Sequence, residues 1–205
     1  MRHTVNMSAR YALLLLMVFA VLGCWGGSKP PVTFYTLTPI SAMQDAGSGQ
    51  TNLKDVLIGI GPLKFPKILD RPQIVTRPAP GRLNLAEFQR WGGFLKDDFL
   101  SVMAENMTIL LGTDQVVVYP WPGGLNPLYR LEFEVHQFDG KLGDSVVLSV
   151  SWILKTPEKT DNTHLKRATI VQPVSGPDYG ALVAAKSMAL EKLSRMIVDE
   201  MKNII

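Results

Sequence analysis

The chain has 205 residues, of which 46% are hydrophobic and 19% charged, and its formal net charge is +3. This length and composition are typical of a globular protein with a sizeable core, and they exclude a disordered or low-complexity chain. With one cysteine the chain forms no internal disulfide, so its core depends on packing and hydrogen bonds.

The N-terminal residues have the layout of a secretory signal. Basic residues precede an uncharged run, 11–22, which as a helix would extend ~18 Å and is too short for the ~30 Å core of a bilayer. The residues Val-Leu-Gly-Cys at 21–24 resemble the lipobox of bacterial lipoproteins. The resemblance implies a signal peptide over residues 1–23 and a covalent lipid on Cys24. A plain signal that leaves a free thiol is the alternative.

Removal of residues 1–23 changes the charge of the chain. That segment holds two arginines and no acidic residue, so 19 basic and 18 acidic side chains remain. The resulting net charge of +1 gives no support to nucleic-acid binding. Residues 24–33 contain glycines and prolines that predict a tether, and residues 34–205 are long enough for one domain.

The domain is expected to start with short strands and a proline-rich segment. Aromatic and β-branched residues predict a strand at 34–39, and the nearly continuous apolar run at 56–62 predicts a strand buried on both faces. Five prolines between residues 62 and 82 exclude a helix from most of that segment. Residues 73–76 suit a short edge strand.

The first helix is expected between Asn84 and Gly112. Asn84 and Glu87 have capping-box spacing, apolar residues then recur at helical spacing, and Gly112 suits a C-cap. The stripe consists of Phe88, Trp91, Leu95, Phe99, Val102, Met103, Ile109 and Leu110, with Asn106 as its polar member. The pattern predicts a core-facing helix of about 24 residues.

The next part of the chain has the pattern of strands. Residues 116–120 predict a strand that ends in a turn-rich loop, and residues 129–140 and 145–155 alternate apolar and polar side chains with period two. The connection Asp-Gly-Lys-Leu-Gly-Asp indicates a hairpin, so this pair is expected to be antiparallel. Residues 164–172 are expected to add a third strand.

A second helix is expected at the end of the sequence. Ser175 and Asp178 have capping spacing with Pro177 in the first turn, and an apolar stripe follows. Lys186 lies inside this stripe, and core packing alone does not account for it. Two long helices against a mainly antiparallel sheet make the predicted fold an α+β single domain.

The chain lacks the patterns of catalytic and metal sites. It has no nucleophile elbow, P-loop or dinucleotide-binding fingerprint, and one cysteine with the two scattered histidines that follow residue 23 cannot close a structural zinc site. His136 and Asp139 have the spacing of an acid–base pair, although an exposed strand histidine is more often simply a surface residue. We therefore expect a protein that is not an enzyme and has no cofactor besides the lipid on Cys24.

Two proline-rich loops carry the residues best suited to binding. Residues 62–82 combine apolar and basic side chains on a stiff backbone, and residues 120–128 add an aromatic anchor. The candidate contacts to a partner or a neighbouring subunit are Phe65, Ile68, Leu69, Arg71, Trp121 and Leu125. The alternative is that both loops fold over the core and bury their own apolar side chains.

Several stretches together resemble the ABC-type transport auxiliary lipoproteins, whose best-known branch is PqiC-like. These stretches are the lipobox cysteine, Tyr-Thr-Leu-Thr-Pro at 35–39, Leu-Asp-Arg-Pro-Gln-Ile-Val-Thr-Arg at 69–77, Arg90-Trp91 with its helix, Val-Val-Val-Tyr-Pro-Trp at 116–121 and the closing helix. The stretch at 69–77 is the most specific of them.

The resemblance implies a membrane-integrity lipoprotein, acylated with palmitate or a similar chain, on the periplasmic face of the outer membrane. Trp25 after the cysteine, rather than aspartate, agrees with outer-membrane sorting. The implied partner is an inner-membrane protein with mammalian-cell-entry (MCE) domains, which forms a lipid conduit. A homo-oligomer of this chain would dock that conduit at the outer membrane. The alternative is a carrier that holds an acyl chain inside the domain. Large inward residues such as Phe99, Phe133 and Trp152 argue against it, because they favour a filled core.

Overall fold

The computed structural model describes residues 30–40, 56–156 and 163–204. The chain divides into two units, Met1–Pro31 and Val32–Ile205, and the fold described below is that of the second. The predicted signal peptide, Cys24 and most of the predicted tether lie outside the described residues. Lipidation at Cys24 therefore remains a prediction.

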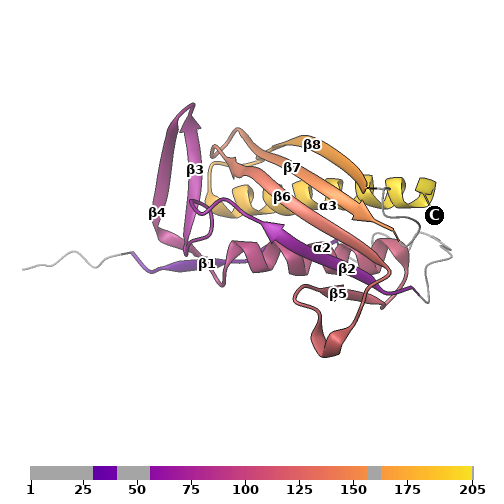
Figure 1. Cartoon of the computed structure of the whole chain (residues 1–205). Helices are drawn as coiled ribbons and strands as arrows, with labels where there is room; N and C mark the ends of the chain where they lie inside the picture. The colour runs from indigo at the N-terminus through magenta and orange to yellow at the C-terminus, as the bar shows by residue number, and fades with distance from the viewer. Residues whose placement is uncertain (1–29, 41–55, 157–162, 205) are drawn as a thin grey trace, which may run out of the picture. The chain divides into compact units, whose positions relative to one another are not determined.

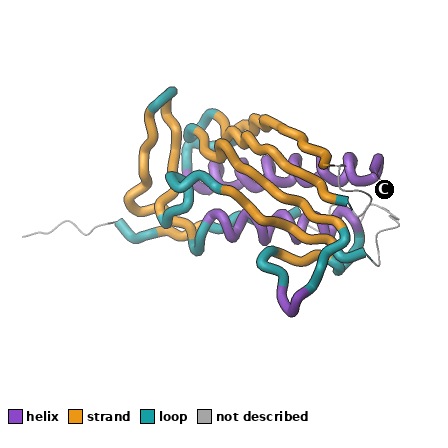
Figure 2. The backbone as a smooth tube through the Cα atoms, in the orientation of Figure 1, coloured by secondary structure: helices purple, strands orange, loops and turns teal. Residues whose placement is uncertain are grey.

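The second unit contains two sheets and two helices (Figure 1, Figure 2). The larger sheet has the order β5-β2-β6-β7-β8, and the smaller has the order β1-β4-β3. The strands are β1 (Thr33–Tyr35), β2 (Ile58–Lys64), β3 (Gln73–Ala79), β4 (Arg82–Trp91), β5 (Val116–Val118), β6 (Tyr129–Gly140), β7 (Ser145–Lys155) and β8 (Thr163–Pro173). The helices are α2 (Leu95–Leu111) and α3 (Tyr179–Ile204), with a short 3-10 turn, η1 (Pro122–Gly124), before β6.

Both sheets are mixed, whereas the sequence predicted a mainly antiparallel sheet. The meander β6-β7-β8 is antiparallel, as predicted. However, β2 pairs in parallel with β5 and with β6, and β1 pairs in parallel with β4. Parallel partners require long crossovers, so they come from distant parts of the chain and leave no local pattern. The α+β class is confirmed, with this correction to the sheets.

The meander buries the face that the alternation predicted. On β6 the side chains of Leu131, Phe133 and Val135 are buried, while those of Glu134 and His136 are exposed. A register shift between Val135 and Gln137 returns Phe138 to the buried face. On β7 the buried side chains are Val146, Leu148, Val150, Trp152 and Leu154. This face packs against α3, which contacts β7 and β8.

The first helix begins at Leu95, not near Asn84 as the sequence predicted. Residues 82–91 instead form β4, which pairs with β3 on one side and with β1 on the other. The predicted capping box of Asn84 and Glu87 was therefore wrong, because both residues belong to the strand. Gly112 does end the helix as predicted, with a left-handed φ of 64°.

The second helix also starts later than predicted. The carboxylate of Asp178 accepts the backbone N–H of Ala181 at 2.8 Å, which makes Asp178 the N-cap residue. Ser175 does not cap the helix, and Pro177 precedes its first turn. The capping chemistry was thus identified correctly, but it was assigned to the wrong residue.

The core lies between the larger sheet and the helices. The ring of Phe99 on α2 is fully buried, and three other phenylalanine rings meet it edge to face. The centroid distances from Phe99 are 6.3 Å to Phe65, 5.9 Å to Phe133 and 6.0 Å to Phe138. These aromatic side chains fill the space between α2 and the sheet.

Candidate functional site

The first candidate loop, residues 65–72, joins β2 to β3, and only part of it faces solvent. Phe65 packs on the core, and Leu69 is itself a core residue with 2% of its surface exposed. Ile68 is 39% exposed. Arg71 is half-buried, and its Nε has no hydrogen-bond partner among the described residues. Ile68 and Arg71 are thus the candidate contacts that this loop presents at the surface.

The second candidate loop, residues 119–128, is anchored by Trp121. The ring of Trp121 lies edge-on to that of Tyr119, with centroids 5.4 Å apart, and the guanidinium carbon of Arg130 lies 4.9 Å from its centroid. Trp121 is half-buried, and it packs against Tyr119 of the loop and Arg130 of β6. Leu125, 43% exposed, is the candidate contact that faces solvent.

Gly59 on β2 makes room for this loop. A Cβ atom at Gly59 would lie 2.8 Å from Cγ of Pro127 and 2.9 Å from Nε1 of Trp121. These separations are shorter than van der Waals contact, so the loop can lie against β2 here because glycine has no side chain. The glycine in this strand therefore has a packing role that the sequence pattern alone did not indicate.

The structure does not bring the two loops together. Residues 65–72 follow the C-terminal end of β2, whereas residues 119–128 cover Gly59 near its N-terminal end (Figure 1). Ile68 and Leu125 therefore belong to separate surfaces of the domain. Any function that uses both loops has to involve two different contacts.

The motif at 35–39 has a structural role that its sequence did not reveal. Polar side chains of both helices hold the backbone that follows β1. On α2, Asp98 accepts the Thr36 hydroxyl at 3.0 Å. On α3, the hydroxyl oxygen of Ser187 accepts the N–H of Thr38 at 3.0 Å. These bonds fix the start of the domain on the helix pair.

Lys186, which the sequence left unexplained, is buried in the core with 1% exposure. Its Nζ donates to the backbone carbonyl of Phe138 at 2.5 Å and lies 4.3 Å from the centroid of the same ring. The ring of Trp91 is 5.4 Å away on β4. Burial lowers the pKa of Lys186 to about 7, while the charge of Asp139 partly opposes that shift.

Asp139 does not form the acid–base pair proposed with His136. Its buried carboxylate accepts hydrogen bonds from Nε and Nη2 of Arg77 at 2.9 and 2.8 Å, and another from Gln137 at 2.8 Å. The Nε2 atom of His136 instead lies 2.9 Å from the hydroxyl oxygen of Ser151. The hydrogen bond to Asp139 raises the pKa of Arg77. This ion pair joins β3 to β6 and has a structural role.

The larger sheet has an open surface groove, and the described part of the chain shows neither a cluster of metal ligands nor a membrane-spanning helix. An open groove of about 250 Å³ on the larger sheet is lined by Pro62, Lys64, Glu134, Ile153 and Leu165, among others. Within residues 30–40, 56–156 and 163–204, no three His, Cys, Asp or Glu side chains are placed to share a metal ion. No helix in those ranges has the length and apolar character needed to cross a membrane.

Comparisons with known proteins identify the family. The model of the ABC-type transport auxiliary lipoprotein component matches residues 35–198. A crystal structure of an uncharacterized protein is similar with a TM-score of 0.68 and 17% identity, over 84% of this chain and 99% of its own. A DUF330 protein from Xanthomonas campestris gives a TM-score of 0.65 and 18% identity, over 81% and 92%.

Because their identity to the chain is low, these two structures show a shared fold and nothing more. The sequence has no significant match among curated proteins. The family match covers most of the chain and includes the motif at 35–39 and the stretch at 69–77. The protein therefore belongs to the ABC-type transport auxiliary lipoprotein family, whose PqiC-like members are transport components and not a class of enzyme.

Proposed function

We propose that the chain is an outer-membrane lipoprotein subunit of an MCE-type intermembrane lipid transport system. In this role it docks the periplasm-spanning conduit at the inner face of the outer membrane. The observation that carries the proposal is the family match over residues 35–198, which begins a short distance after a lipobox-like sequence that ends at Cys24. The short tether between them would hold the domain beside the membrane.

The packing of the core supports docking over the alternative of lipid carriage. A carrier needs an enclosed apolar cavity of several hundred Å³ between the sheet and the helices. In this domain the ring of Phe99 and its aromatic neighbours occupy that space. The groove on the larger sheet is open, and charged side chains such as Lys64 and Glu134 line it. A groove of that kind does not suit a buried acyl chain.

Separate loops suit a subunit with two kinds of neighbour. A ring of identical subunits needs a head-to-tail contact between copies, and a docking ring needs a second surface for the conduit. The loop with Ile68 and the loop with Leu125 lie at different ends of β2, and each exposes an apolar side chain. We propose that one loop contacts the neighbouring copy and the other the MCE-domain partner.

The test is purification of the full-length tagged chain from the cell envelope in mild detergent. The proposal predicts a homo-oligomer that retains an MCE-domain protein and carries lipid only as the covalent group on Cys24. Native mass spectrometry distinguishes the carrier alternative, which predicts an additional lipid bound without a covalent bond. A monomer that retains no MCE-domain protein would count against docking.

A further inference from the structure

We infer that the end of the domain around β1 docks on the phospholipid surface through an apolar patch. The β1 patch consists of Val32, Phe34 and Phe94, whose exposures are 41%, 65% and 58%. Large apolar side chains that gather at the surface of a soluble domain indicate an interaction site. The inference rests on the proposed lipid anchor at Cys24 and adds that the protein itself touches the membrane.

One backbone hydrogen bond joins the two chain segments that carry the β1 patch. The N–H of Gly92 donates to the carbonyl of Tyr35 at 2.7 Å, which ties β1 to the turn before α2. Phe34 is the residue before Tyr35, and Phe94 is the N-cap residue of α2, two positions after Gly92. The side chains of Val32 and Phe34 point to the same face because they are two residues apart along an extended chain.

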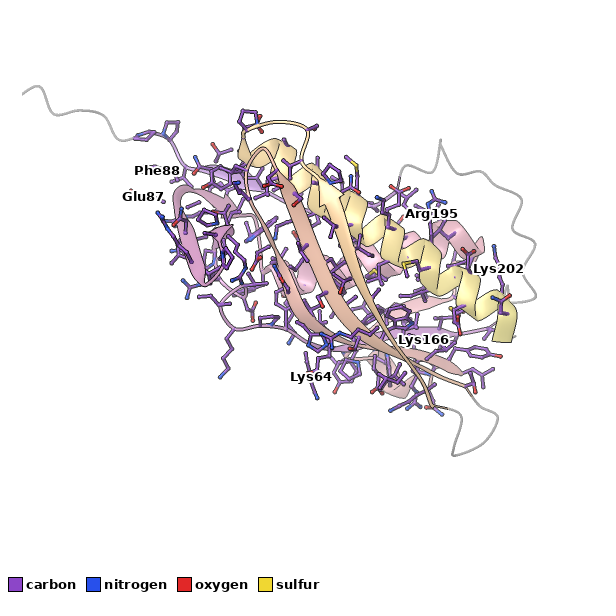
Figure 3. All side chains as sticks on the ribbon, turned by 90° about the horizontal axis from the view of Figure 1, so that it is seen from above. Lys64, Glu87, Phe88, Lys166, Arg195 and Lys202 are labelled. Carbon is purple, nitrogen blue, oxygen red and sulfur yellow. The ribbon has the colours of Figure 1, made fainter. Side chains whose placement is uncertain are left out.

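Strand β4 extends the same face. The parallel register pairs Thr33 with Gln89 and Phe34 with Arg90, which places Phe88 beside Val32. Phe88 is half-buried, and Figure 3 shows it at the opposite end of the domain from Lys202. Phe88 therefore extends the apolar surface of Val32 and Phe34 onto β4.

Arg90 gives the patch a positive charge. Its side chain is half-buried, it forms no ion pair with another described residue, and its Nε has no hydrogen-bond partner among them. A guanidinium group beside apolar side chains suits a surface that combines acyl chains with phosphate groups. We therefore assign the occupant as a phospholipid surface and not as an acidic protein segment.

The tether places this patch at the membrane. Val32 is eight positions after Cys24, and a fully extended chain spans at most about 3.6 Å per residue, or roughly 29 Å in total. An acylated Cys24 would thus keep Val32 within about 29 Å of the bilayer at all times. Interfacial apolar side chains insert roughly 5–10 Å below the headgroups. Docking would fix the orientation of the domain, which the flexible tether alone cannot do.

The single cysteine of the chain permits a direct test. Acylation blocks the nitrogen and the sulfur of Cys24, so a cysteine introduced elsewhere is the only free thiol. The full-length acylated protein is reconstituted into vesicles of phosphatidylethanolamine and phosphatidylglycerol. An environment-sensitive fluorophore is attached to Phe34→Cys or Phe94→Cys. The matched control is Leu165→Cys, which has the same 65% exposure as Phe34 but lies on the larger sheet next to Lys166.

Docking predicts blue-shifted emission at positions 34 and 94, with loss of emission when the vesicles contain brominated acyl chains. The fluorophore at position 165 should show neither effect, and Figure 3 shows its neighbour Lys166 far from Phe88. Equal quenching at positions 34 and 165 would overturn the inference. So would rapid disulfide linkage between two copies of Phe34→Cys without lipid quenching, because a second copy would then cover the patch. Labelling of the unsubstituted protein at Cys24 would identify a failure of the lipid anchor itself.

Discussion

The side-chain oxygen of Asn106 on α2 accepts the backbone N–H of Ile40 at 2.9 Å. Asn106 is completely buried, and its amide nitrogen donates to the hydroxyl of Ser194 on α3 at 3.0 Å. One polar side chain in the apolar stripe therefore joins the segment after β1 to both helices. This segment directly follows β1, the first strand after the predicted tether.

Replacement of Asn106 by leucine should destabilise the domain. The N–H of Ile40 would lose its partner inside the core, which costs about 1–3 kcal/mol in the free energy of unfolding. The Ser194 hydroxyl would lose the amide donor but keep its own bond to the carbonyl of Leu190 at 2.8 Å. Urea denaturation followed by circular dichroism measures the loss. The control is Asn203→Leu on the exposed end of α3, where about 0.5 kcal/mol or less is expected. Similar losses in the two variants would contradict this role of Asn106.

The substitution Gly59→Ala should loosen the loop that carries Trp121. The added methyl group would overlap Pro127 and the indole of Trp121, so we expect a loss of about 1–3 kcal/mol and a change in tryptophan fluorescence. The matched control is Gly93→Ala, because a Cβ there meets no atom within 4 Å. If both variants unfold at the same denaturant concentration as the parent, the loop is not packed on β2 as described.

Local patterns predicted those parts of the fold that depend on nearby residues. The β6-β7 hairpin follows from period-two alternation and its connecting turn, and Gly112 follows from the requirements of a helix C-cap. Residues 82–91 were misassigned because Phe88 and Trp91 also fit a helical stripe. Pairing with β1 and β3 decides their structure, and this tertiary effect overrides the local pattern.

The candidate sites, too, could be predicted only where they depend on nearby residues. The proline-rich loops were predicted, but sequence alone could not separate Leu69, which is in the core, from Ile68, which is exposed. The role of Lys186 depends on a carbonyl and two rings from β4 and β6, all distant in sequence. The β1 patch joins residues about 60 positions apart in the chain, and the parallel register of β1 with β4 brings them together.

Lys186 should make stability depend on pH in a defined direction. Its pKa is about 7 in the folded protein, against an ordinary lysine value of 10.5. Between these values the unfolded chain binds the proton more strongly, so the free energy of unfolding should rise with pH by up to about 1.4 kcal/mol per unit. This contribution is absent in Lys186→Met.

The measurement is urea unfolding of the parent and of Lys186→Met from below pH 7 to about pH 10.5. The parent should gain stability relative to the variant as the pH rises above about 7, and the difference should be constant below it. Lys202→Met, at an exposed position of α3, controls for changes in overall charge. A difference that is independent of pH would show that Lys186 stays protonated in the core.

The substitution Cys24→Ala should release the protein from the membrane without unfolding it. If Cys24 carries the lipid, its loss removes the acyl chains that hold the domain, since each buried methylene contributes about 0.8 kcal/mol to attachment. Cell fractionation should then find the folded variant in the periplasmic fraction or mislocalised, and the parent in the outer membrane. Unchanged membrane retention of Cys24→Ala would defeat the lipoprotein interpretation.

Site-specific photo-crosslinking in living cells tests the docking proposal most directly. A photoreactive residue is placed at Ile68 or Leu125, and at Val171 as an exposed control on the larger sheet. Docking predicts a light-dependent adduct with an MCE-domain protein from one of the two loops and with a second copy of the chain from the other. The control position should give neither adduct. Failure of both loops to crosslink an MCE-domain protein, in cells that produce one, would contradict docking.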